Sequence, residues 1–138
     1  MSDPDLGERL RQLGAWEEIF TAPDFSVGEP AGWIPDADGV IQLPYMAYSK
    51  EIERFVSDMG RLGWVYPFAW GAWPATTRGQ QLLAEPAEIS TATAAELAKL
   101  LTTIIREDRF SDFAIAHAFD RGLLTAIAHR ARELAAEL

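Results

Sequence analysis

The residues best suited to recognise a ligand lie in one stretch, WVYPFAWGAW at residues 64–73, which holds five aromatic rings. These rings belong to Trp64, Tyr66, Phe68, Trp70 and Trp73. Such rings can stack on a base, a sugar or a peptide side chain, so one hypothesis is a ring-lined pocket or groove. The alternative is that the stretch supplies core to a small protein. We favour the alternative, because large apolar patches are uncommon on soluble monomers, and we expect Trp73 above the other rings to be partly exposed.

A second candidate is the charged stretch REDRFSD at residues 106–112. Arg106 and Arg109 carry guanidinium groups that suit a phosphate or a carboxylate ligand, and Asp108 and Asp112 add carboxylates nearby. The same stretch fits the end of one helix and the start of the next, with Phe110 filling the core and Asp112 capping the second helix. We favour this structural interpretation. The candidate residues for binding a ligand or partner are, from both stretches, Trp64, Tyr66, Trp70, Trp73, Arg106 and Arg109.

No constellation typical of an enzyme accompanies these residues. The chain has two histidines and no cysteine, and His117 and His129 lack the spacing of a metal site. Ser49, Ser57 and Ser111 lack the glycines that surround a nucleophilic serine at a sharp strand–helix turn. We therefore name no catalytic residue, expect no metal and no cofactor, and leave enzymatic activity open with a leaning against it.

A helix-turn-helix unit is a further hypothesis, because AFDRG at residues 118–122 places an alanine four residues before a glycine between two expected helices. The second of these helices would offer DNA the side chains of Thr125, His129, Arg130 and Arg132. The net charge of −9 weighs against this hypothesis, since an acidic surface repels phosphate backbones. Nucleic acid is therefore an unfavoured partner.

The composition is that of an ordinary globular protein, with 49% hydrophobic and 24% charged residues. A length of 138 residues suits a single domain, residues 1–138. The start of the chain shows no signal peptide, and no apolar run is long enough to span a membrane. Together with the absence of cysteine, these features lead us to expect a cytoplasmic protein with no membrane partner.

The elements that position these side chains are mainly helices, predicted from apolar residues at helical spacing. The expected helices cover residues 3–20, a segment from 44–49 to 60–63, residues 76–84, 93–108 and 112–121, and a last helix that begins at Leu123. Ser2 with Asp5 is expected to form a capping box for the first helix, and Ser111 to cap the fifth. In the second helix, Arg54 and Asp58 are expected to form an ion pair.

Two segments lie between these helices. Glycines and prolines predict a long loop over residues 21–47, with a short hairpin that pairs residues 33–34 with 40–43 around a turn at 35–39. Residues 64–75 are expected to be extended, because large rings alternate with smaller side chains from Trp64 to Trp70 and would share one side. The predicted fold is all-α: one compact domain of four to six helices with the aromatic segment joining its halves.

Two long segments carry a resemblance to a known family: LPYMAYSKEIERFVSDMGRLGWVYPFAWGAW and LAKLLTTIIREDRFSDFAIAHAFDRGLL. They resemble a bacterial and phage domain of unknown function with the pattern L-P-Y…Y-S…F…G-x-V-x-P-F-D-W-x-x-W, then L-L-T…R-x-x-R-F…A-F-x-x-G. The matching positions run from Leu43 to about His129. The resemblance implies a small, mainly helical domain and no particular activity. One position departs from the pattern, because Ala69 stands where members of the family commonly have aspartate.

We carry three functional hypotheses from the sequence. The first is a non-enzymatic, acidic protein-interaction module that binds another protein; an inhibitor encoded by a mobile element is one form of it. The second is a small ligand-binding domain or enzyme that uses the aromatic stretch with Arg106–Asp112. The third is a DNA-binding regulator that uses the turn at residues 118–122.

Overall fold

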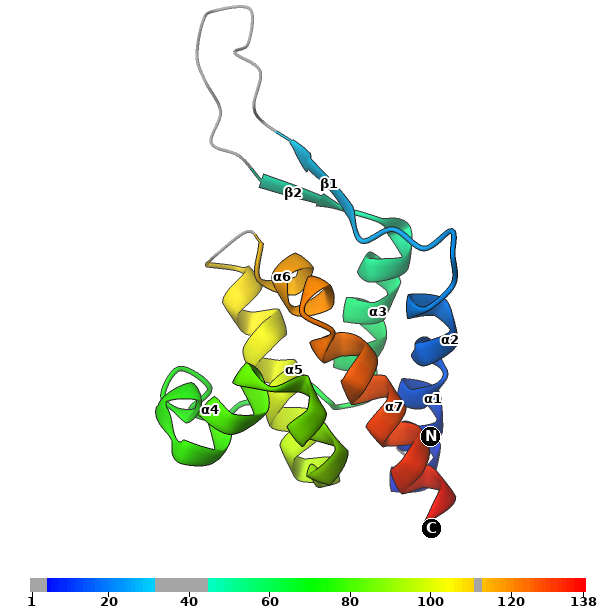
Figure 1. Ribbon diagram of the computed structural model, residues 1–138, viewed down its shortest axis with the longest axis vertical. Helices are drawn as coiled ribbons and strands as arrows, with labels where there is room; N and C mark the ends of the chain where they lie inside the picture. The colour runs from blue at the N-terminus through cyan, green and yellow to red at the C-terminus, as the bar shows by residue number, and fades with distance from the viewer. Residues whose placement is uncertain (1–4, 32–44, 111–112) are drawn as a thin grey trace, which may run out of the picture.

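The computed structural model describes residues 5–31, 45–110 and 113–138 (Figure 1). It is 66% helical, which confirms the predicted all-α fold. The α-helices in these ranges are α1 (Leu6–Gly14), α2 (Trp16–Phe20), α3 (Lys50–Arg61), α4 (Thr77–Ala84), α5 (Ala94–Asp108), α6 (Ala114–Asp120) and α7 (Leu123–Ala136). Two 3-10 helices, η1 (Trp73–Ala75) and η2 (Pro86–Thr91), flank α4. None of the described helices is long and apolar enough to cross a membrane.

The expected first helix is divided in two at Ala15. Asp5 is its N-cap and accepts a hydrogen bond from the Glu8 backbone N–H at 2.7 Å, whereas Ser2 lies outside the described residues. The division comes where α1 crosses α7 at close range: a Cβ added to Gly14 would lie 2.3 Å from Cγ of Arg132. A glycine at the contact lets the two backbones approach in this way.

A two-stranded antiparallel hairpin projects beyond the helices in Figure 1. Its strands are β1 (Gly28–Ala31) and β2 (Tyr45–Tyr48), paired with Gly28 opposite Tyr48. The predicted pairing of residues 33–34 with 40–43, and its turn at 35–39, lie outside the described residues. Gly28 has a φ of +126°, and a Cβ there would come within 2.2 Å of the Ala47 carbonyl oxygen, so only glycine fits this position.

Side-chain caps start three of the predicted helices. Ser49 caps α3 and Thr76 caps α4, each by accepting a hydrogen bond from a backbone N–H of the first turn. Thr93 and Glu96 form a capping box at the start of α5, in which each side chain accepts from the other residue's backbone N–H. These contacts agree with the expected helices over 76–84 and 93–108. The expected caps Ser111 and Asp112 lie outside the described residues.

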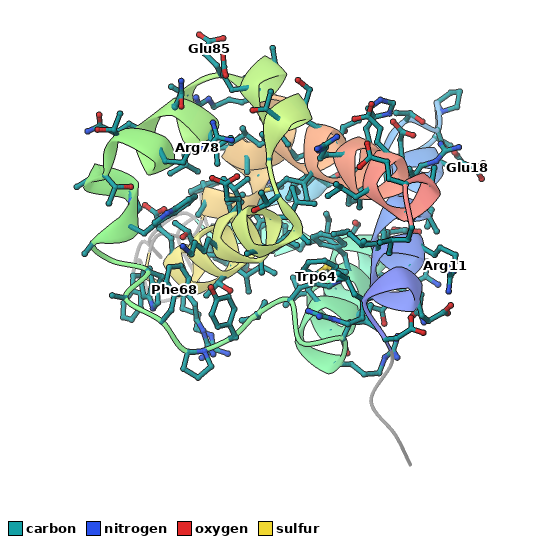
Figure 2. All side chains as sticks on the ribbon, turned by 90° about the horizontal axis from the view of Figure 1, so that it is seen from below. Arg11, Glu18, Trp64, Phe68, Arg78 and Glu85 are labelled. Atoms are coloured by element: carbon teal, nitrogen blue, oxygen red, sulfur yellow. The ribbon has the colours of Figure 1, made fainter. Side chains whose placement is uncertain are left out.

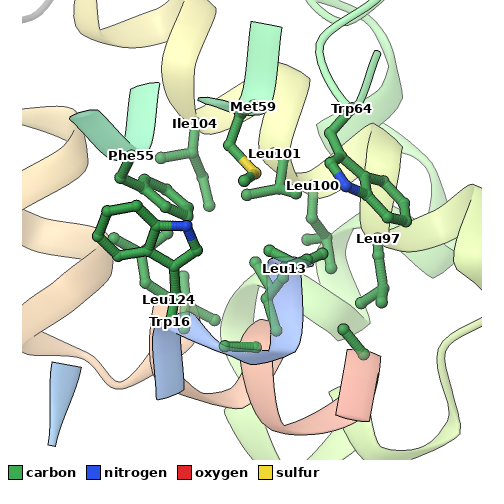
Figure 3. Close-up of a cluster of buried hydrophobic side chains, with 14 of the residues drawn as sticks. Leu13, Trp16, Phe55, Met59, Trp64, Leu97, Leu100, Leu101, Ile104 and Leu124 are labelled. Atoms are coloured by element: carbon green, nitrogen blue, oxygen red, sulfur yellow. The ribbon is translucent and has the colours of Figure 1, made fainter. Parts of the chain in front are cut away.

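One hydrophobic core joins the helices, and Figure 3 shows part of it. Three rings meet at one end, where Phe55 of α3 contacts Trp16 and Phe20 edge-on at centroid distances of 5.3 and 5.2 Å. Trp64 lies at the other end of the cluster. Leucines and isoleucines from α1, α5 and α7 fill the space between them: Leu13, Leu97, Leu100, Leu101, Ile104 and Leu124. Each such side chain stabilises the fold by about 1.5–3 kcal/mol.

The expected ion pair between Arg54 and Asp58 is replaced by two other contacts. Asp58 Oδ1 lies 3.5 Å from Nη2 of Arg61. The Arg54 guanidinium instead lies over the Trp16 ring, 5.8 Å from its centroid. A cation above an indole face is attracted by the ring quadrupole, an interaction that the helical spacing of α3 alone does not reveal.

Substituting two glycines tests the close crossing of α1 and α7. Gly14→Ala should lower the free energy of unfolding by about 1–3 kcal/mol, because the new methyl group collides with the stem of Arg132. Gly60→Ala is the matched control, since a Cβ added there would have no other group within 4 Å, and it should stabilise α3 by about 0.5 kcal/mol. Urea denaturation followed by circular dichroism measures both. Equal stabilities of the two variants would contradict the close crossing.

The ion pair between Arg78 and Glu96 should make stability depend on pH. Nε of Arg78 lies 2.6 Å from Oε2 of Glu96, and this hydrogen bond lowers the pKa of Glu96 below 4.5. Its contribution is therefore complete above pH 4.5 and is lost as the pH falls through the lowered pKa of the folded state. Thermal melts from pH 7 to pH 3 should show Glu96→Gln less stable than the natural protein at pH 7, with the gap closing in acid. A constant gap would mean that the charge on Glu96 is unimportant.

Candidate functional site

The end of α3 sets the direction of the aromatic stretch. Gly63 adopts a left-handed conformation with φ +79°, and the Trp64 N–H donates back to the Met59 carbonyl at 2.9 Å. This is the Schellman arrangement that commonly ends a helix, and it requires a residue that tolerates positive φ. The turn directs Trp64 into the core, where its side chain is 1% exposed and the Arg9 guanidinium lies 4.5 Å from its ring centroid.

A buried threonine of α5 then holds the stretch in place. The Thr102 hydroxyl donates to the Trp64 carbonyl at 3.1 Å and accepts from the Tyr66 N–H at 3.2 Å. Thr102 is fully buried, so its hydroxyl satisfies two backbone groups that lie against an apolar helix face. The contact fixes the segment on α5 immediately before the remaining rings.

The chain turns sharply after Phe68, so residues 64–75 are not extended throughout. The Trp70 N–H donates to the Phe68 carbonyl at 2.7 Å, and the Trp73 N–H donates to the Ala69 carbonyl at 3.1 Å, leading into η1. These turns break the alternation, and the expectation that the four large rings share one side fails. Of these rings, Trp64 is the one that is buried in the core. Tyr66 and Trp73 are half-buried and pack against the core, and Phe68 and Trp70 are half-buried as well.

Three of the half-buried rings line an open hollow of about 370 Å³. Its lining, which we call the aromatic–arginine hollow, consists of Tyr66, Pro67, Phe68, Trp70, Arg106, Arg109 and Phe110. Tyr66 stacks on Phe68 with centroids 5.0 Å apart, and Trp70 stacks on Phe110 at 6.0 Å. Phe110 is 81% exposed, so the expectation that it fills the core is wrong. It lies just beyond the end of α5, where its ring contacts Trp70 instead of the core.

Two guanidinium groups complete the lining. Within the described residues, neither Arg106 nor Arg109 takes part in an ion pair. The carboxylate between them in sequence is used elsewhere: Asp108 Oδ1 accepts from the Tyr48 hydroxyl at 2.5 Å and from the Ile115 N–H at 3.1 Å. The hollow therefore keeps two positive charges that Asp108 does not neutralise.

The contact between Tyr48 and Asp108 ties three elements together. The hydroxyl of Tyr48 on β2 also accepts from the Ala116 N–H of α6 at 3.3 Å. Burial, and then the hydrogen bond to Asp108, raise the pKa of Tyr48 well above its usual value, so the hydroxyl stays protonated and donates. By holding Ile115 N–H as well, Asp108 satisfies a free N–H of the first turn of α6.

Four of the six predicted binding residues meet in the aromatic–arginine hollow: Tyr66, Trp70, Arg106 and Arg109. Trp64 does not, because it is core; Figure 2 shows it well apart from Phe68. Trp73 does not line the hollow either, although its ring touches Phe68 edge-on at 6.4 Å. Its half-buried state agrees with the expectation of partial exposure.

Other residues that build the hollow were missed from the sequence. Phe68 and Phe110 are core rings in the favoured interpretation of the sequence, yet both line it, and Pro67 lines it as well. Thr102 carried a signal, because a threonine lies among the apolar residues of α5 that face the core. The partnership of Tyr48 with Asp108 spans sixty positions of the chain and carries no local signal.

The lining of the hollow offers groups that suit binding. Rings supply stacking surfaces, and two guanidiniums supply charge-assisted hydrogen bonds to an anion. Within the described ranges, no three His, Asp or Glu side chains gather in a way that could hold a metal ion. His117 stacks on Phe113, and His129 contacts Glu17 of α2, so the two histidines lie away from the lining.

A family model matches residues 6–137, nearly the whole chain. The chain belongs to DUF6508, a family of unknown function. The match covers every α-helix of the fold and the aromatic–arginine hollow, so the hollow lies within the DUF6508 domain. Neither a curated protein nor a solved structure matches the chain. Ala69, the position that departs from the pattern of the resemblance, accepts two backbone hydrogen bonds at the start of the turn before η1.

Alanine substitutions separate the ring in the core from the ring at the surface. Trp64→Ala should lower the free energy of unfolding by about 3–5 kcal/mol, because it leaves a cavity beside α5. Phe110→Ala should change it by at most about 0.5 kcal/mol, since most of that ring already contacts solvent. Chemical denaturation measures both values. A large loss for Phe110→Ala would show that the ring stabilises the fold and is not held free for binding.

Proposed function

We propose that this domain is a non-enzymatic protein-interaction module whose contact surface is the aromatic–arginine hollow. Its occupant is a segment of a partner protein that carries an acidic side chain next to an apolar one. The acidic group would bind Arg106 and Arg109, and the apolar side chain would cover Phe110 and Trp70. We propose further that the domain acts in the cytoplasm. One form of the proposal is that it is an inhibitor encoded by a mobile element.

The observation that carries the proposal is the exposed Phe110 beside two arginines that form no ion pair in the described part of the chain. A phenylalanine that is 81% exposed leaves apolar surface in contact with water. Covering that surface with a partner would lower the free energy. Aromatic residues and arginine are the types most enriched in the energetically important part of protein interfaces. The two features together favour an anionic and apolar partner surface.

A small anionic molecule with a flat ring is the second candidate for the same hollow. A volume of about 370 Å³ is within the range of small-molecule pockets, and paired guanidiniums bind phosphate or carboxylate groups. The hollow opens widely to solvent, however, whereas such pockets enclose most of their ligand. A segment of a protein fits this shape better, because such a segment can bind by one face while its other face stays in solvent.

The DNA-binding hypothesis has less support from the side chains that would read bases. Glu17 of α2 lies 2.6 Å from both His129 and Arg132, and Arg130 donates to the Ala92 carbonyl at 2.9 Å. These contacts hold α7 against the rest of the domain. That hypothesis stays a prediction, and a mobility-shift assay at about 50 mM salt tests it.

Removing the two guanidiniums of the aromatic–arginine hollow tests the interaction proposal. Arg106→Ala combined with Arg109→Ala should abolish retention of the partner that the natural domain captures from host lysate at low salt. Phe110→Ala should weaken retention at least about tenfold, as loss of a central aromatic contact does. The control is Arg11→Ala combined with Arg61→Ala, which changes net charge equally but removes arginines from exposed helix pairs outside the hollow.

Retention that survives in the hollow variants and in the control alike would contradict the proposal. A thermal-shift series with nucleoside monophosphates and aromatic carboxylates decides the second candidate. Stabilisation by about 2–3 kcal/mol at a hundredfold excess over the Kd, lost in the double arginine variant, would move the assignment to a small ligand.

A further inference from the structure

Two larger hollows lie along α1, α2 and α3, away from the aromatic–arginine hollow. Their volumes are about 490 and 420 Å³. Ile19 and Arg54 line both of them, so the two adjoin each other, and we call them together the acidic furrow. It runs from Gln12 on α1 to Phe25, which follows α2, with α3 along its other side.

The floor of the furrow is apolar. Phe55 of α3 reaches across to contact Trp16 and Phe20, so aromatic rings fill the base of the gap between α2 and α3. Above these rings, Ile19 and Phe25 line the furrow and are only half-buried. The acidic furrow is the open space above these rings, between α2 and α3. Such a channel is the shape that receives a helix or an extended segment from another protein.

The rim of the furrow carries an excess of negative charge. Glu18, Asp24 and Glu51 line it, and none of them forms an ion pair with another described residue. Asp58 adds a fourth carboxylate, paired with Arg61 at 3.5 Å. Among the described residues that line the furrow, Arg54 is the one basic side chain, and its guanidinium is turned over Trp16. Figure 2 shows Glu18 pointing outward from α2.

The spacing of these carboxylates suits several separate basic side chains better than one metal ion. In the described part of the chain they do not gather into a group of three that could hold a metal ion. Separate negative charges above an apolar floor match a polymer that carries several basic side chains and an apolar stripe. A net charge of −9 would add to the attraction by steering a basic partner towards the domain.

We infer that the acidic furrow is a second interaction surface, which binds a basic amphipathic segment of a partner protein. Its preference is opposite to that of the aromatic–arginine hollow, which offers positive charge to an anion. The inference does not depend on the proposed function of that hollow, because the two linings share no residue. One domain would thereby hold two partners, or two segments of one partner, by surfaces of opposite charge.

The test uses the full chain and a helical peptide of about 18 residues built from leucine and lysine, which forms about five turns with one basic face. Titration at about 50 mM salt, followed by backbone amide NMR, should shift the resonances of Ala15, Ile19, Ala22 and Phe25. Glu18→Lys combined with Asp24→Lys should weaken binding at least about tenfold. Phe110→Ala should leave it unchanged, which separates this inference from the proposed function.

The matched control is Glu85→Lys combined with Glu137→Lys, which changes the net charge equally at exposed positions outside the furrow. It should weaken binding about twofold or less, through long-range charge alone. Equal losses in the two double variants would overturn the inference, because binding would then follow net charge and not the furrow. Shifts confined to other parts of the domain, or self-association that the furrow variant abolishes, would overturn it as well.

Discussion

The hydroxyl of Thr102 is the contact on which the arrangement of the site depends. It satisfies the Trp64 carbonyl and the Tyr66 N–H at once, in a place where water does not reach. With Trp64 buried and the next residues held on α5, the chain turns at Ala69 and leads into η1, and the remaining rings stay half-buried. The aromatic stretch therefore has two roles. Its first ring stabilises the fold, and Tyr66, Phe68 and Trp70 line an open hollow together with the end of α5.

The charge of that hollow depends on which groups the carboxylate of Asp108 binds. Asp108 lies between Arg106 and Arg109 in sequence, yet its oxygen accepts hydrogen bonds from Tyr48 and from the first turn of α6. A half-buried hydroxyl and a helix N-terminus both favour a nearby carboxylate, so this arrangement stabilises the junction of β2, α5 and α6. The consequence is a pair of guanidiniums that Asp108 leaves available to a ligand, on a protein whose net charge is −9.

Net charge is accordingly a poor guide to the charge of any one surface of this domain. The acidic furrow follows the overall charge, while the aromatic–arginine hollow opposes it. Charges within about 10 Å of a site dominate its potential at physiological salt, because the solution screens those farther away. A domain of 138 residues can therefore present two surfaces of opposite preference without conflict between them.

The sequence by itself determined the local elements of this protein. Apolar spacing specifies helices through contacts a few residues apart, so the main helices and the mainly helical fold followed from it. Ser49 and Thr93 cap two of these helices by equally local contacts. It also identified the two stretches that meet in the hollow. The tertiary structure decided which ring is core, that Phe110 is exposed, and where Asp108 points. These outcomes depend on partners far away in sequence, Thr102 for Tyr66 and Tyr48 for Asp108, and no periodicity records which distant residue will satisfy a buried polar group.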